Sequence, residues 1–216
     1  MIRDRLQTER GLLSLLNFSG KNVLEIGCGE GYFSEMLIAE GASLIAIDPD
    51  EKKLAITKKK LQEHIDKFDC RVMSGDDLFI FDDNLFDFVF FSYSLHHHPE
   101  PIKAIVEAYR VLIPGGEIIV IEPVANGEYC RFLAPVHDET AVLAKADFSL
   151  RLFHSKRKTN FNYTVDWVFD NRDDLIRSLY KSYGSRLALF QHMTKVYPPE
   201  GEISLEDEVI LWRIQK

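Results

Sequence analysis

A glycine-rich turn early in the chain has the residue types of a ligand-binding loop. Gly27, Gly29 and Gly31 lie between an apolar, strand-like run at 22–26 and a helix-like run at 32–40. Glycine lets the backbone approach a ligand closely, and the free N–H groups and dipole of the following helix face the same place. The dinucleotide fingerprint G-x-G-x-x-G would need a glycine where this chain has Tyr32. The spacing therefore argues against a dinucleotide.

Acidic residues follow the next predicted strands and narrow the choice of ligand. Asp48 comes 19 positions after Gly29, near the offset at which a carboxylate accepts hydrogen bonds from ribose hydroxyls. Asp76 follows the third strand, where it could accept from an exocyclic amine. Glu25 precedes the glycines, so it would repel a pyrophosphate and suit an amine or a sulfonium. These residues predict a ligand with an adenosine end and a cationic, non-phosphate end.

The elements that must position these residues alternate along the chain. Buried, strand-like runs at 22–26, 43–47, 70–73, 86–91 and 117–121 are separated by helix-like runs at 32–40, 51–64 and 102–112. This alternation predicts an α/β protein with a doubly wound, mostly parallel sheet, whose ligands bind outside the carboxyl ends of the strands. Later runs predict helices at 138–153 and 171–183 and two closing strands at 187–191 and 208–214.

Composition and charge restrict the class of protein. The 216 residues suffice for one sizeable domain, and a formal net charge of −8 argues against a large nucleic-acid footprint. No apolar run approaches the roughly 20 residues of a membrane span. Cys28, Cys70 and Cys130 form no close pair in sequence, which argues for a reducing compartment. We expect a cytoplasmic protein, and the oligomeric state stays open.

Five short motifs follow one another over residues 20–125. They are V-L-E-I-G-C-G-E-G at 23–31, the acidic Asp48, G-D at 75–76, F-D-F-V-F-F-S with L-H-H at 86–97, and R-V-L-I-P-G-G at 110–116. In this order and spacing they resemble the class I S-adenosylmethionine-dependent methyltransferases, and most closely the small-molecule type. The resemblance implies a seven-stranded, Rossmann-like sheet with an antiparallel strand near one edge.

The resemblance also implies how the cofactor is held. The backbone of Gly27, Cys28 and Gly29 would pack against the methionine part, and Glu25 would support its amino group. Asp48 would bind the ribose hydroxyls, and Pro49 would border the adenine. Asp76 would accept from the adenine amine, and the Asp77 N–H would donate to an adenine ring nitrogen. Ser92 and Tyr93 would lie near the methyl-bearing sulfur. S-adenosylhomocysteine would be the product.

Methyl transfer by in-line displacement depends mainly on alignment and exclusion of water, and a base helps if the acceptor is a hydroxyl. Candidate bases are His96, His97, Glu122 and His137, among which we favour His97 and Glu122. No metal is expected, because adjacent histidines on a regular element diverge and no carboxylate spacing completes a site.

One domain over 1–216 is expected, with an N-terminal helix within 1–19 and a substrate-pocket or lid insertion at 126–165. Apolar residues of this insertion that could line a pocket are Phe132, Leu133, Leu143, Phe148, Leu152 and Phe153. A basic cluster at 151–158 is either a solvated surface or an anion site. The acceptor is expected to be a small molecule, with the methylated atom (O, N, C or S) left open. Two alternatives remain: a nicotinamide-dependent oxidoreductase and a non-catalytic S-adenosylmethionine-binding regulatory protein.

Overall fold

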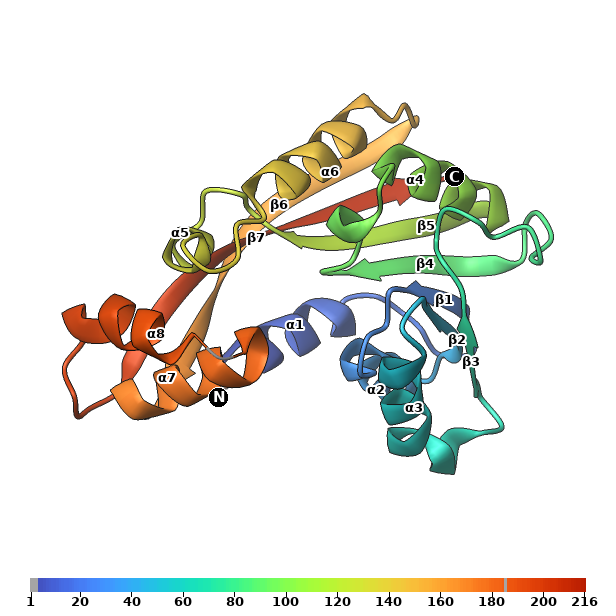
Figure 1. Cartoon of the computed structure of the whole chain (residues 1–216). Coiled ribbons are helices and arrows are strands. Elements are labelled where there is room, and N and C mark those ends of the chain that lie inside the picture. The colour runs from blue at the N-terminus through green and yellow to red at the C-terminus, as the bar shows by residue number, and fades with distance from the viewer. Residues whose placement is uncertain (1–3, 185) are drawn as a thin grey trace.

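Seven strands form one sheet in the order β3-β2-β1-β4-β5-β7-β6 (Figure 1). The computed structural model describes residues 4–184 and 186–216. The strands are β1 (Asn22–Ile26), β2 (Ser43–Asp48), β3 (Phe68–Val72), β4 (Phe86–Ser92), β5 (Leu112–Pro123), β6 (Arg157–Phe169) and β7 (Ile203–Gln215). Strands β1 to β5 pair in parallel, and β7 runs antiparallel between β5 and β6. The predicted fold class is confirmed.

The strand order reverses at β1, which has β2 on one side and β4 on the other. Sheets of this kind bind ligands at such a reversal, outside the carboxyl ends of the strands. The glycine turn after β1 and the Ser92–Tyr93 segment after β4 both lie there. The fold therefore brings together motifs that are more than 60 residues apart in the sequence.

Helices cover both faces of the sheet because successive strand residues point to opposite sides. Phe90 of β4 packs with Leu13, Leu37 and Leu54 from the helices of one face, whereas its neighbour Phe91 belongs to the core of the other face. The first face carries α1 (Asp4–Ser14), α2 (Tyr32–Ala39) and α3 (Glu51–Lys60), and the second carries α4 (Pro101–Val111) and α6 (Thr140–Leu152). Among the described helices, none is long and apolar enough to cross a membrane.

A third apolar cluster forms where β6 and β7 extend beyond the other strands. Leu175 and Phe190 are fully buried in it, together with Leu205 of β7. It is enclosed by α5 (Glu128–Leu133), α7 (Arg172–Tyr183) and α8 (Leu187–Met193), as Figure 1 shows. Short 3₁₀ turns complete the chain at Gln62–His64, at Leu95–His97 (η2) and at Thr194–Val196.

Two predicted elements are wrong. The run 187–191 is part of the helix α8 rather than a strand, because Phe190 and Met193 turn one side of a helix into the third cluster. The range 126–165 is not one insertion either. Its first part forms α5 and α6, while its last residues lie in β6, an edge strand of the sheet.

Candidate functional site

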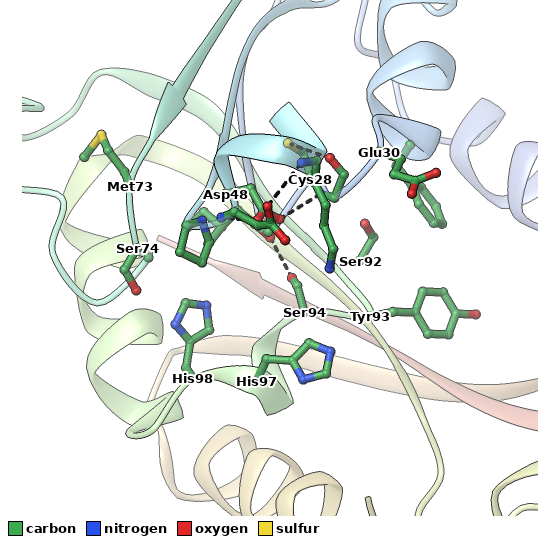
Figure 2. Close-up of a pocket in the computed structure, with 18 of the residues that line it drawn as sticks. Cys28, Glu30, Asp48, Met73, Ser74, Ser92, Tyr93, Ser94, His97 and His98 are labelled. Carbon is green, nitrogen blue, oxygen red and sulfur yellow. Dashed lines mark hydrogen bonds between the residues drawn. The ribbon is translucent and has the colours of Figure 1, made fainter. Parts of the chain in front are cut away.

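A cavity of about 640 Å³ opens at the carboxyl ends of β1, β2, β3 and β4. Its volume is within the range that small-molecule sites occupy. Figure 2 shows Cys28 and Asp48 on one side of it, and His97, the last residue of η2, with His98, which follows η2, on the other. The predicted site residues that line it are Gly27, Cys28, Gly29, Asp48, Pro49, Ser92, Tyr93 and His97, and the lining also includes Glu30, Tyr32, Lys53, Ser74 and Ser94.

The glycine turn is fixed by its neighbours as well as shaped for a ligand. Gly27 has φ 75°, and a Cβ there would lie 2.4 Å from the Cβ of Ser94. Its N–H and that of Cys28 donate to the carbonyl of Ile47, at 2.8 and 3.0 Å. Gly29, in contrast, would carry a Cβ into open space. Gly27 is therefore required by the fold, and Gly29 is the position at which a side chain would enter the cavity.

Cys28 is a packing residue, as predicted from its place among the glycines. It is 5% exposed, and burial raises the pKa of its thiol well above the usual range. All three cysteines are free. A thiol that stays protonated is a poor nucleophile, so covalent chemistry at Cys28 is not favoured.

Asp48 links the glycine turn to the end of β2. One carboxylate oxygen accepts from the Gly29 N–H at 2.9 Å and the other from the Asp50 N–H at 2.8 Å. Each carboxylate oxygen can accept a further hydrogen bond, and Asp48 lines the cavity. Asp48 can thus accept further hydrogen bonds from a ligand in the cavity, and its contact to ribose stays a prediction.

Glu25 lies behind the cavity wall and does not line it. Its side chain is fully buried, and Oε2 accepts a hydrogen bond of 2.5 Å from the Ser34 hydroxyl on α2. Burial raises the pKa of Glu25 to about 8 against the effect of that hydrogen bond, and the charge of Asp48 adds to the rise. Oε1 has no hydrogen-bond partner among the described residues. Burial therefore favours the protonated form of Glu25 in the ligand-free protein, and its support of the methionine amino group stays a prediction.

Tyr93 connects the end of β4 to α1. It takes a left-handed backbone conformation, φ 52°, which is uncommon for a non-glycine residue. This conformation lets its hydroxyl donate to Glu9 Oε1 of α1 at 2.6 Å, while the residue lines the cavity. The N-terminal helix, expected within 1–19, is thereby attached to the cavity wall.

Asp76 and Asp77 are not brought to this cavity. The backbone at Gly75 packs so closely on β1 that a Cβ there would lie 2.4 Å from Ile26. A turn with an Asp77 N–H to Ser74 carbonyl bond then directs both aspartates outward. Asp76 accepts from the Ser74 hydroxyl, which lowers its pKa, and both aspartates line a separate cavity beside α4. Their predicted adenine contacts have no support in this arrangement.

The favoured bases, His97 and Glu122, have different environments. His97 is exposed on the cavity wall, where loss of solvent and the charge of His96 lower its pKa. Glu122 is 3% exposed and does not line the cavity. It accepts from the His96 ring nitrogen Nδ1 at 2.5 Å and from the His96 N–H at 3.2 Å. His97 therefore faces the cavity, whereas Glu122 fixes the orientation of His96.

Glu139 is a site residue that the sequence analysis missed. Its Oε1 lies 3.6 Å from His96 Nε2, 3.9 Å from His97 Nδ1 and 2.8 Å from His137 Nε2. Hydrogen bonding from His96 holds the pKa of Glu139 at about 2. Burial would lower the pKa of His96, but the two carboxylates raise it to about 10. A histidine that holds its proton this firmly is a poor base, and His137 lies outside the cavity lining.

The range 126–165 contributes none of the residues that line the 640 Å³ cavity. Of its predicted pocket residues, Leu133 and Leu143 are buried, whereas Phe148 and Leu152 are more than 60% exposed. Two residues of the basic cluster at 151–158 have partners within the fold. Lys158 donates to the carbonyls of Leu150, Arg151 and Phe153, and Arg151 pairs with Asp147 at 2.7 Å.

Comparisons with known proteins agree with this geometry. Residues 24–120 match the family model of a methyltransferase domain. Over 105 residues the chain is 35% identical to the ubiquinone biosynthesis O-methyltransferase of Dechloromonas aromatica, and over 104 residues it is 36% identical to the demethylmenaquinone methyltransferase of Clavibacter sepedonicus. These alignments cover 49% and 48% of this chain and 45% and 42% of the two relatives. The chain thus spans less than half the length of the curated relatives it matches.

The fold is shared over nearly the whole chain. The YcgJ protein of Bacillus subtilis superposes with a TM-score of 0.67 at 18% identity, over 97% of this chain and 98% of that one. The ordered motifs lie within the stretch that the domain model matches, and the seven-stranded sheet is the fold of the solved neighbour. Residues 24–120 are therefore similar to a methyltransferase domain.

Proposed function

We propose that this protein methylates a hydroxyl group of a small-molecule acceptor with S-adenosylmethionine as the donor. The observation that carries the proposal is the joint placement of the Gly27–Gly29 turn and Asp48 in one cavity at the strand reversal. The relative named a ubiquinone biosynthesis O-methyltransferase supports an oxygen atom as the acceptor. The net charge of −8 favours a small molecule over a nucleic acid.

The residues present fit the cofactor. Asp48 would accept from its ribose hydroxyls, Pro49 would border its adenine, and the open Cβ position of Gly29 leaves room for its backbone-like methionine part. The Oε1 atom of Glu25 lies behind the turn without a hydrogen-bond partner among the described residues. A cationic amine bound nearby would lower the pKa of Glu25 and favour loss of its proton. When bound, S-adenosylmethionine supplies a sulfonium methyl group, which passes to the acceptor oxygen as the sulfur leaves as a neutral thioether.

The chain's own residues orient the acceptor and manage its proton. Tyr93 and its contact to α1 close one side of the cavity, which excludes water from the reacting atoms. His97 lies on the opposite wall with a lowered pKa, so that its neutral imidazole can accept the hydroxyl proton. His96, held protonated between Glu122 and Glu139, keeps η2 in place.

Calorimetry with S-adenosylmethionine and S-adenosylhomocysteine tests the cofactor site. Both are expected to bind the wild-type chain, and Asp48→Asn is expected to bind about 10- to 100-fold more weakly because it loses charged hydrogen bonds. Asp66→Asn, an exposed aspartate outside the cavity, is the matched control. Absence of binding of either compound at sub-millimolar concentration would overturn the proposal. Release of S-adenosylhomocysteine with phenolic acceptors, slowed in His97→Ala, would then identify the acceptor class.

A further inference from the structure

Side chains of His96, His97 and Glu139 gather where η2 meets the start of α6. One nitrogen from each histidine and one oxygen from Glu139 all lie within 4.8 Å of one another. Glu139 Oε1 is 3.6 Å from His96 Nε2 and 3.9 Å from His97 Nδ1. Glu139 comes from the turn before α6, more than 40 residues after the histidines, so tertiary folding creates the cluster.

The structure contradicts both premises on which no metal was expected from the sequence. It assumed that adjacent histidines diverge, but on the 3₁₀ turn η2 the rings of His96 and His97 have centroids 4.0 Å apart. It also assumed that no carboxylate completes a site, and Glu139 supplies one. The first premise assumed a regular element, which this 3₁₀ turn is not. The second considered only residues close in sequence, whereas Glu139 is brought to the histidines by tertiary folding.

A second carboxylate fixes the orientation of the buried histidine. Glu122 accepts from His96 Nδ1 at 2.5 Å and from the His96 N–H at 3.2 Å, so that the other ring nitrogen, Nε2, points toward Glu139. Histidines that bind metals in proteins commonly have their second nitrogen held by a carboxylate in this manner. In the metal-free protein the same two carboxylates hold His96 protonated, so the ion would take the place of the Nε2 proton, which passes to solvent.

We propose that His96 Nε2, His97 Nδ1 and Glu139 Oε1 bind a divalent transition-metal ion of the Zn²⁺ type. Imidazole nitrogen and carboxylate oxygen suit this ion, and ligands about 2 Å from a tetrahedral centre are about 3.4 Å apart. The observed separations of 3.6 and 3.9 Å need only a small contraction. His137, 2.8 Å from the same oxygen of Glu139, would orient that carboxylate.

The position of the ion gives it a role in the reaction, and this part rests on the proposed function. His97 lines the 640 Å³ cavity, so a fourth coordination position would open toward the acceptor. A hydroxyl bound to the ion would lose its proton to solvent water more readily than a free hydroxyl does. Because His97 Nδ1 cannot bind an ion and accept a proton together, the ion would activate the acceptor in the metal-loaded protein.

Binding of Co²⁺ to tag-free, metal-stripped protein tests the site without cofactor or acceptor. Wild-type protein is expected to bind one equivalent, followed by calorimetry and by the visible absorption of the ion. His97→Ala and Glu139→Gln are expected to lower the affinity at least tenfold, and Glu122→Gln about 10- to 100-fold. His154→Ala, an exposed histidine outside the cluster, is the matched control and should bind as the wild type does.

Thermal unfolding separates lost ligands from lost folding. Co²⁺ should raise the melting temperature of the wild type and not that of Glu139→Gln. Absence of stoichiometric binding, or equal binding by Glu139→Gln and the wild type, would overturn the metal proposal and leave an ion-pair network. Binding of S-adenosylmethionine is measured separately, so failure of the metal site and failure of the proposed function give different results.

Discussion

Two carboxylates at the ends of neighbouring strands have opposite environments. Asp48 accepts two backbone N–H groups and reaches the cavity, whereas Glu25 is sealed between β1 and α2 with one oxygen unpartnered among the described residues. Burying a carboxylate without full hydrogen bonding favours its protonated form. Burial therefore favours the protonated form of the Glu25 carboxyl, whereas the Asp48 carboxyl has its oxygens at the cavity and held by backbone N–H groups.

Glu25→Gln is expected to stabilise the protein increasingly as the pH rises. The pKa of Glu25 is about 8 in the folded state and near 4.5 when unfolded, so the folded state binds more protons between these values and loses stability as the pH increases. Each pKa unit corresponds to about 1.4 kcal/mol. The melting temperature of the variant should exceed that of the wild type by more than about 5 °C at pH 9, and by little at pH 5.

Circular dichroism melts between pH 5 and pH 9 make the comparison. Glu35→Gln, an exposed glutamate on the same helix as Ser34, is the control and should leave the pH profile unchanged. A difference between Glu25→Gln and the wild type that stays constant over this range would mean that Glu25 titrates normally in the folded protein.

At single residues, the sequence predicted the cavity lining better than the chemistry. The glycine turn and Asp48 could be identified because their local spacing determines where they lie. Asp76 was misplaced because a tight turn at Gly75 decides its direction. Glu139 could not be found because only the packing of α6 against η2 brings it to His96. The pKa values of Glu25 and His96 likewise depend on burial, which the sequence does not contain.

At the scale of elements, a hydrogen bond of 2.6 Å from Tyr93 to Glu9 joins α1 to the cavity wall. Tyr93→Phe keeps the ring but removes this bond to a carboxylate, worth about 1.5–3 kcal/mol. Amide hydrogen exchange in α1 should therefore accelerate, while exchange in β1 and β4 stays unchanged. Tyr180→Phe, at an exposed position on α7, is the control. Equal exchange in α1 of both variants would show that apolar packing through Leu13 suffices to hold the helix.

Most elements could be predicted where the apolar residues follow the period of a helix or form the continuous run of a buried strand. The strands at 22–26, 43–47 and 86–91 are continuous apolar runs, and the helix beginning at Glu51 has the predicted Asp50 cap, which accepts from Lys52 and Lys53. The run 187–191 satisfies both an alternating and an i, i+3 pattern, so period alone could not assign it. The strand β6 was missed because it is an edge strand with mostly polar residues in its first half.

Over the whole molecule, the cavity and the third apolar cluster lie at different parts of the sheet. The cavity is lined by residues between Ile26 and Pro99, whereas the third apolar cluster lies on the extension of β6 and β7 with α5, α7 and α8. His137 and Glu139 lie between α5, which belongs to the third apolar cluster, and α6. Glu139 contacts both His137 and His96 of η2.

Phe190→Ala tests whether the third cluster unfolds separately from the rest of the sheet. Phe190 is fully buried there, and its truncation should cost about 3–5 kcal/mol. If the cluster is a separate cooperative unit, exchange should accelerate in α7, α8 and the paired ends of β6 and β7 around Phe169 and Ile203, but not in β1 to β5. Leu187→Ala, on the same helix but 46% exposed, should change little. Binding of S-adenosylmethionine should persist in Phe190→Ala because the cluster contributes nothing to the cavity lining, whereas uniform acceleration across all strands would show one cooperative unit.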